Sequence, residues 1–126
     1  MATVLVLAGT LVGTADAVAQ ANPRIFAPDT ISDHRWQWRI TFTPSGDTAY
    51  YAVSDGFFPA ARVATIVMSA RTADGWSHPV VAPFSGNHQD MDPFVTRDGT
   101  RLYFSSSRPT PADSAEERSD FDIWYV

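Results

Sequence analysis

The chain has 126 residues, of which 44% are hydrophobic and 13% aromatic, a composition typical of a globular protein with a packed core. Fourteen acidic residues against nine basic ones, all nine of them arginine, give a formal net charge of −5. A mildly acidic chain has no basic surface to attract nucleic acid or anionic membranes, so we expect neither as a partner. The absence of cysteine excludes disulfide bonds.

Residues 1–21 differ in kind from the rest of the chain. A short apolar core at residues 4–12 is followed by two small-x-small motifs, AVA at 17–19 and AQA at 19–21. This order predicts a secretory signal peptide over residues 1–21, although no lysine or arginine precedes the apolar core. The apolar run is too short to span a bilayer. We therefore expect a periplasmic or secreted protein with no integral membrane segment after signal removal; a buried N-terminal helix or strand is the alternative.

Residues 22–37 form a predicted lead-in segment, and the region after it has a β pattern throughout. Short runs rich in Ile, Val, Tyr, Phe and Thr alternate with turns of Pro, Gly, Asp and Ser about every ten residues, and no segment shows sustained helical spacing. Residues 57–61 and 110–119 are predicted loops. The predicted strands cover residues 38–43, 48–54, 63–70, 76–81, 93–96, 101–107 and 121–126.

Residues 41–55 and 94–109 are two copies of one phrase, at an offset of about 53 residues. Each copy has a glycine in a predicted hairpin turn, where a left-handed backbone conformation is cheap only for glycine. The aligned pairs are Thr43 with Thr96, Gly46 with Gly99, Tyr50 with Tyr103, Tyr51 with Phe104 and Ser54 with Ser107, four of which are identities.

The strand that follows the second glycine is apolar on both faces. Leu102 and Phe104 point to one face and Tyr103 to the other, because successive side chains of a strand alternate. A strand of this kind must be covered on both sides, as happens when a sheet is stacked between two neighbouring sheets. The pattern therefore favours the environment of a β-propeller blade.

The second copy resembles the PD40 or TolB-like repeats, which are WD40-like β-propeller repeats of bacterial periplasmic proteins. Their usual phrase is DPxFSPDGxxLYFxSxR, followed after a loop by DIY or DIW. The first copy departs from it, with Ser45 in place of the aspartate and no DIY element. The matching residues of the second copy are Asp92, Pro93, Phe94, Asp98, Gly99, Leu102, Tyr103, Phe104, Ser105, Ser107, Arg108, Asp122, Ile123 and Trp124.

The resemblance implies an all-β fold, a β-propeller of four-stranded antiparallel blades. Residues 38–126 would form a partial propeller, with blade 1 at about 38–83 and an incomplete blade 2 at about 90–126. Because one and three quarters blades cannot close a ring, we expect an N-terminal fragment of a chain with about five or six repeats; a ring formed by oligomerisation is the alternative. The resemblance gives structural roles to Gly46, Asp92, Pro93, Asp98, Gly99, Tyr103, Phe104, Asp122 and Trp124.

His88, Asp90 and Asp92 are the candidate metal ligands. If this stretch is extended, the spacing of two puts one imidazole and two carboxylates on one face, a set that fits a divalent cation such as calcium. The sequence favours the other interpretation, in which these side chains satisfy backbone groups or line a central channel. Asp120 and Asp122 form a similar pair, for which we expect a turn or capping role. No other cofactor is expected.

Trp36 and Trp38 flank Gln37 and could stack on a sugar ring, but aromatic residues at the start of a first blade are more typical of a core. The chain has no G-x-S-x-G motif, and no catalytic residue is predicted. We therefore expect a noncatalytic scaffold that binds a protein or a cell-envelope component. The alternative is the propeller domain of a hydrolase, either glycoside-active or a peptidase whose catalytic domain lies beyond Val126.

Overall fold

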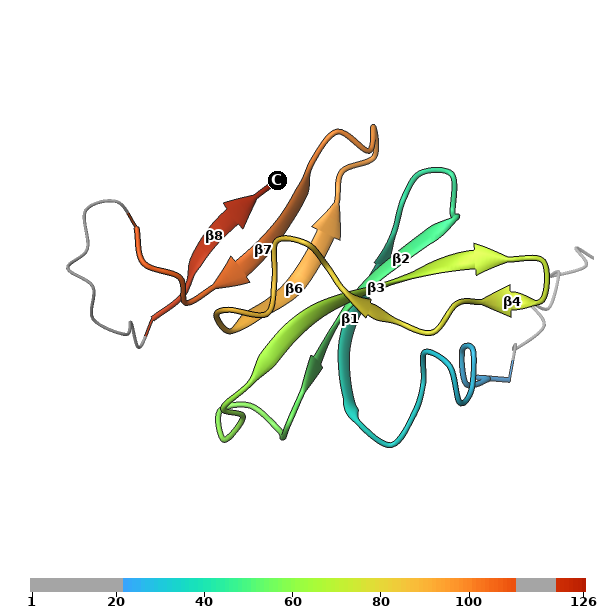
Figure 1. Ribbon diagram of the computed structural model, residues 1–126, viewed down its shortest axis with the longest axis horizontal. Helices are drawn as coiled ribbons and strands as arrows, with labels where there is room; N and C mark the ends of the chain where they lie inside the picture. Colours follow the sequence, from blue (N-terminus) through green and yellow to red (C-terminus); the bar gives the residue numbers. More distant parts are fainter. Residues whose placement is uncertain (1–21, 111–119) are drawn as a thin grey trace, which may run out of the picture.

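The computed structural model describes residues 22–110 and 120–126, and these residues form two antiparallel β-sheets without any helix (Figure 1). The all-β expectation is therefore confirmed. A membrane-spanning helix is likewise not found among the described residues. The first sheet contains β1 (Trp36–Phe42), β2 (Thr48–Ser54), β3 (Ala64–Thr72), β4 (Gly75–Trp76) and β5 (Val80–Val81). The second sheet contains β6 (Asp90–Val95), β7 (Leu102–Ser106) and β8 (Asp122–Tyr125).

The strand order follows the chain in both sheets. In the first sheet β1 pairs with β2 and β2 with β3, while β4 and β5 both pair with β3. In the second sheet β7 lies between β6 and β8. Six of the predicted strands are present within a few residues, but the one predicted over 76–81 is split into β4 and β5. Pro79 lies in the gap, and it has no N–H to donate to a ladder. The predicted signal peptide and most of the loop at 110–119 lie outside the described residues.

The two hairpin turns of the repeat have the same geometry. Gly46 and Gly99 have φ angles of 70° and 71°, the left-handed conformation expected for them. Gly46 N–H donates to the Thr43 carbonyl (2.8 Å), and Gly99 N–H donates to the Thr96 carbonyl (2.9 Å). The aligned glycines therefore form the same turn in the β1–β2 and β6–β7 hairpins.

The aspartate of the turn occupies a different position in each copy. In the second turn the Thr96 hydroxyl donates to Asp98 (2.6 Å). In the first turn Ser45 stands at that position, and the Thr43 hydroxyl donates instead to Asp47, on the other side of the glycine (2.8 Å). These hydroxyl donors lower the pKa of both carboxyl groups. The first copy thus keeps the contact that its sequence seemed to have lost.

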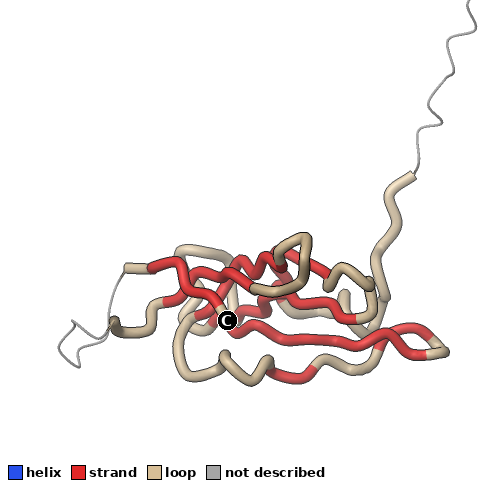
Figure 2. The backbone as a smooth tube through the Cα atoms, turned by 90° about the horizontal axis from the view of Figure 1, so that it is seen from above, coloured by secondary structure: helices blue, strands red, loops and turns tan. Residues whose placement is uncertain are grey.

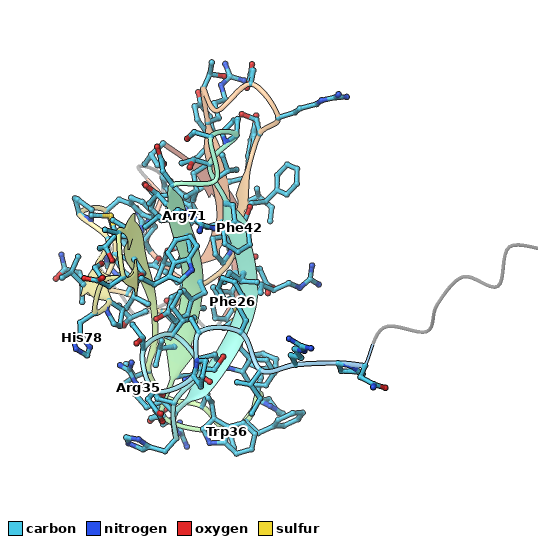
Figure 3. The ribbon with its side chains drawn as sticks, turned by 90° about the vertical axis from the view of Figure 1, so that its right-hand side faces the viewer. Phe26, Arg35, Trp36, Phe42, Arg71 and His78 are labelled. Atoms are coloured by element: carbon cyan, nitrogen blue, oxygen red, sulfur yellow. The ribbon has the colours of Figure 1, made fainter. Side chains whose placement is uncertain are left out.

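The lead-in segment covers one face of the first sheet. Ile31 packs in a buried cluster with Ala49, Tyr51 and Val67. Phe26 lies edge-on to the rings of Phe42 and Trp76, with ring centroids 5.7 Å away in each case (Figure 3). Seen from above in Figure 2, the segment leaves the body of the molecule towards residue 22. The lead-in segment therefore shields this face of the first sheet from solvent.

The second sheet covers the opposite face of the first, with β6 lying against β1, β2 and β3 (Figure 1). Ile66 and Ala82 form a buried cluster with Leu102 and Phe104, and Tyr50 packs against it. Full burial of a leucine or phenylalanine side chain contributes about 1.5–3 kcal/mol. This cluster is the main apolar contact between the two sheets.

Asp33 ties the lead-in segment to the start of β1. Its carboxylate accepts hydrogen bonds from the Arg35 backbone N–H and from Arg35 Nε, both 2.8 Å long, and a third from Gln37 Nε2. The bonds from Arg35, above all the one from its side chain, lower the pKa of Asp33 from 3.8 to about 2. The carboxylate is therefore held ionised in the folded state.

We predict that Asp33→Asn lowers the free energy of unfolding at pH 7 by about 1 kcal/mol, the size of an exposed ion pair. A lowered folded-state pKa means that this stabilisation is present above the unfolded value of 3.8 and is lost as the pH falls through about 2. Urea unfolding of both proteins from pH 7 to pH 2 measures the effect. A difference between them that persists undiminished at pH 2 would contradict the prediction.

We predict that Tyr51→Phe leaves the free energy of unfolding unchanged or raises it by up to about 1 kcal/mol. The Tyr51 hydroxyl is buried and has no hydrogen-bond partner among the residues that the structure describes, and its burial raises the pKa of the phenol. The second copy carries Phe104 at this position. Urea unfolding checks the change against Tyr103→Phe, and a loss above about 1 kcal/mol for Tyr51→Phe alone would refute the argument.

Candidate functional site

The first strand of each sheet, β1 in one and β6 in the other, carries the same β-bulge. The pairing register of β1 shifts between Trp38 and Thr41, and that of β6 shifts between Met91 and Phe94, each pair about 53 residues from its counterpart. An extra residue at a bulge leaves the ladder and bends the strand. The bulge therefore changes which side chains share a face in both strands.

Each bulge holds one non-glycine residue with a positive φ angle, Arg39 at 41° and Asp92 at 55°. These two residues occupy the same place in the repeat, and Arg39 Nε lies 3.5 Å from Asp92 Oδ1. Both side chains are solvent-exposed, so the pair contributes at most about 1 kcal/mol. The repeat motif's aspartate thus faces its own counterpart from the first copy.

Asp90 is fully buried and belongs to a structural network. Its carboxylate accepts hydrogen bonds from Arg108 Nη2 (2.9 Å) and from the Ser85 hydroxyl (2.7 Å). Arg108 also donates to the Phe84 carbonyl (3.0 Å), and its guanidinium lies 4.7 Å from the centroid of the Phe104 ring. The network joins β6 to the end of β7 and to the segment that connects the two sheets.

The structure does not gather His88, Asp90 and Asp92 into one site. His88 is exposed, Asp90 is committed to Arg108, and the bulge turns Asp92 towards Arg39. Within residues 22–110 and 120–126 there is no group of three or more His, Cys, Asp or Glu side chains placed to hold a metal ion. The assumption of an extended strand fails because the bulge breaks the alternation.

The other repeat-motif residues take places in the second sheet. Pro93 is buried within the bulge, next to Asp92. Asp122 stands opposite Ser106 in the β7–β8 ladder and makes a further interaction. Trp124 packs against the inter-sheet cluster, 5.5 Å from the Arg108 guanidinium. Each of these residues shapes the sheet or its packing.

The second sheet has an exposed apolar face on the side away from the first sheet. The register places Phe94, Tyr103 and Tyr125 side by side across three strands, and Met91 and Ile123 flank Ser105 in a parallel row. Phe94 and Tyr125 are 60% exposed and Ile123 is 72% exposed. We call this surface the outer face and define it by the side chains of Met91, Phe94, Tyr103, Ile123 and Tyr125.

Trp36, Trp38 and Phe57 form a second exposed cluster, which we call the aromatic patch. Trp36 stacks on Trp38 with an interplanar angle of 14°, and the Phe57 ring lies 5.8 Å from Trp36 and 5.4 Å from Trp38. The expectation of a core position is wrong for Trp36, which is 50% exposed. The neighbouring Phe58 ring packs against Phe121 instead. The patch lies where β1 begins, beside the β2–β3 loop (Figure 1).

Two residues, one in the aromatic patch and one in the β1 bulge, were missed by the sequence interpretation. Phe57 was placed only in a loop, and Arg39 was not aligned with Asp92. Two adjacent phenylalanines at 57 and 58 in a turn-rich loop, with no alternating apolar partner, are a usable signal for an exposed ring. The offset of the repeat was the signal for Arg39.

We predict that Asp90→Asn lowers the free energy of unfolding by about 3 kcal/mol, because it leaves the Arg108 charge unpaired in a largely buried place. Asp92→Asn, the control, costs less than about 1 kcal/mol since its ion pair is exposed. Urea unfolding measures both, and calcium leaves the melting temperature of the wild type unchanged. A calcium-dependent rise that Asp90→Asn abolishes would show instead that Asp90 binds a metal.

Comparison of the chain with protein-family models, with curated proteins and with solved structures gives no match.

Proposed function

We propose that this chain is an exported, noncatalytic binding scaffold built from propeller-type blades, and that it binds a protein or a cell-envelope component. The single observation that carries the proposal is the outer face. Tyr103 aligns with Tyr50, whose side chain packs against the inter-sheet cluster beneath the second sheet. The outer face is therefore the surface on which the repeat seats another layer.

The composition of the outer face supports binding rather than chemistry. Its side chains are large and apolar, and Arg101 adds a guanidinium 5.0 Å from the Tyr125 ring and a hydrogen bond to the Tyr103 hydroxyl (3.3 Å). Contiguous exposed apolar patches of this kind mark interaction sites. Aromatic and arginine side chains are also those enriched at the energetic centres of protein interfaces.

The repeat phrase supports the propeller part of the proposal. The turn glycines, the doubly apolar β7 and the Asp122-Ile123-Trp124 element occur in the order that the PD40 or TolB-like resemblance implies. Within the first sheet, β4 and β5 together occupy the place of a fourth strand. Export is supported by the apolar segment and small-x-small motifs of residues 1–21 alone.

We predict that the wild-type chain self-associates and binds the dye ANS, and that Tyr103→Glu lowers ANS fluorescence at least about twofold and shifts the protein towards monomer. A carboxylate in the centre of the outer face makes its burial costly. Phe57→Glu, which adds the same charge to the aromatic patch, is the matched control and leaves the association state unchanged. Sedimentation velocity and dye titration are the measurements.

Two outcomes would contradict the proposal. A monodisperse wild-type monomer that melts cooperatively and binds no ANS would show that the outer face needs no partner. Turnover of fluorogenic glycosides or peptides by the chain would show that the scaffold is a hydrolase, the alternative that the sequence left open.

A further inference from the structure

The aromatic patch of Trp36, Trp38 and Phe57 is not required by the repeat. At the offset of 53 its three positions correspond to Gln89, Met91 and Thr110, none of which carries a ring. The second sheet forms the same bulge and the same hairpin turn without them. The repeat fold thus does not require aromatic rings at these three positions.

The patch is held rigid by hydrogen bonds instead of by burial. Trp38 Nε1 donates to the Ser54 hydroxyl (2.7 Å), which donates to the Gly56 carbonyl (2.7 Å). The Asp55 carboxylate closes the β2–β3 loop by accepting the backbone N–H groups of residues 62 and 63. Phe57 therefore stays 60% exposed on a loop whose backbone is fixed at both ends. Preorganised rings of this kind lose little entropy when they bind a ligand.

The size of the patch fits a small ligand. A tryptophan or phenylalanine presents about 150–250 Å² of surface, so two half-exposed rings and part of a third offer roughly 300 Å². A stable protein interface buries about 800 Å² on each partner. A second copy of the chain or another protein would therefore need much more surface than the patch supplies, whereas one or two sugar rings would not.

The chemistry around the patch favours a sugar over a nucleobase. Bases also stack on aromatic rings, but they bring phosphates, and this chain carries a net charge of −5. At the same end of the sheet Arg35 and Asp33 form a partly exposed ion pair of 2.7 Å (Figure 3). A pyranose ring has C–H groups on its face, which pack on the negative face of an aromatic ring, and hydroxyls on its edge, which bond to polar groups of this type.

We propose that Trp36, Trp38 and Phe57 form a stacking site for one or two pyranose rings of a neutral glycan. This site makes the proposed function more specific, since a glycan is one class of envelope component. It rests on the proposed function, because it takes the chain to be a binding protein. Its surface is separate from the outer face. The proposals for the two surfaces can therefore be tested independently of each other.

The test is calorimetric titration of the untruncated chain with chitotetraose and with cellotetraose, each up to about 10 mM, the range of weak single-site binding. We expect one of these probes to bind, and Trp36→Ala and Phe57→Ala each to weaken it about tenfold, the equivalent of about 1.4 kcal/mol. Phe94→Ala is the matched control, because Phe94 and Phe57 are both 60% exposed phenylalanines, and it leaves the affinity unchanged. Trp36→Tyr keeps a stacking ring and retains most of the binding.

Three outcomes would overturn the inference. In the first outcome, neither probe binds the wild type. In the second, Phe94→Ala weakens glycan binding as much as Phe57→Ala does. In the third outcome, Trp36→Ala abolishes self-association while no glycan binds, which would make the patch a protein contact. Because Tyr103→Glu changes the outer face alone, glycan binding by that variant separates failure of this site from failure of the proposed scaffold.

Discussion

The structure depends on two strands, β2 and β7, that carry bulky side chains on both faces. A cover stabilises each face of such a strand, because it removes a large apolar group from water. In the first sheet the lead-in segment covers Tyr51 and the second sheet covers Tyr50. In the second sheet the first sheet covers Phe104. The outer face is the side of the second sheet that the described residues leave without such a cover.

Charged side chains fix the layers at points where apolar contact ends, and burial decides which of them matter. The Asp90–Arg108 pair sits within the packing, and the loss of one partner would strand a desolvated charge, so it constrains how β6 meets β7. The Arg39–Asp92 pair is exposed and contributes little energy. Its interest is geometric, because it joins equivalent positions of the two copies. A buried pair and an exposed pair two residues apart in β6 thus have different roles.

Local features were predictable from the sequence, and features that depend on pairing were not. Gly46 and Gly99 predict their turns, because glycine adopts the left-handed backbone conformation at a lower energetic cost than any other residue. The alternation in β7 predicted a strand with large apolar side chains on both faces, and the structure covers only the face of Leu102 and Phe104. The bulges at Arg39 and Asp92 were not predictable, since an extra residue in one strand can be recognised only when the pairing with the partner strand is known. The metal hypothesis for His88, Asp90 and Asp92 assumed an unbroken strand and depended on that missing information.

The two exposed apolar surfaces differ in origin, and the repeat separates them. Tyr103 has a counterpart in Tyr50, which packs against the inter-sheet cluster, so the repeat accounts for a large ring at this position. Trp36 and Phe57 have no aromatic counterparts, yet hydrogen bonds fix the neighbouring Trp38 side chain and the start of the β2–β3 loop. Exposed aromatic rings oppose solubility, so a fold that works without them in one copy has no structural reason to keep them in the other. A ligand that stacks on these rings supplies that reason.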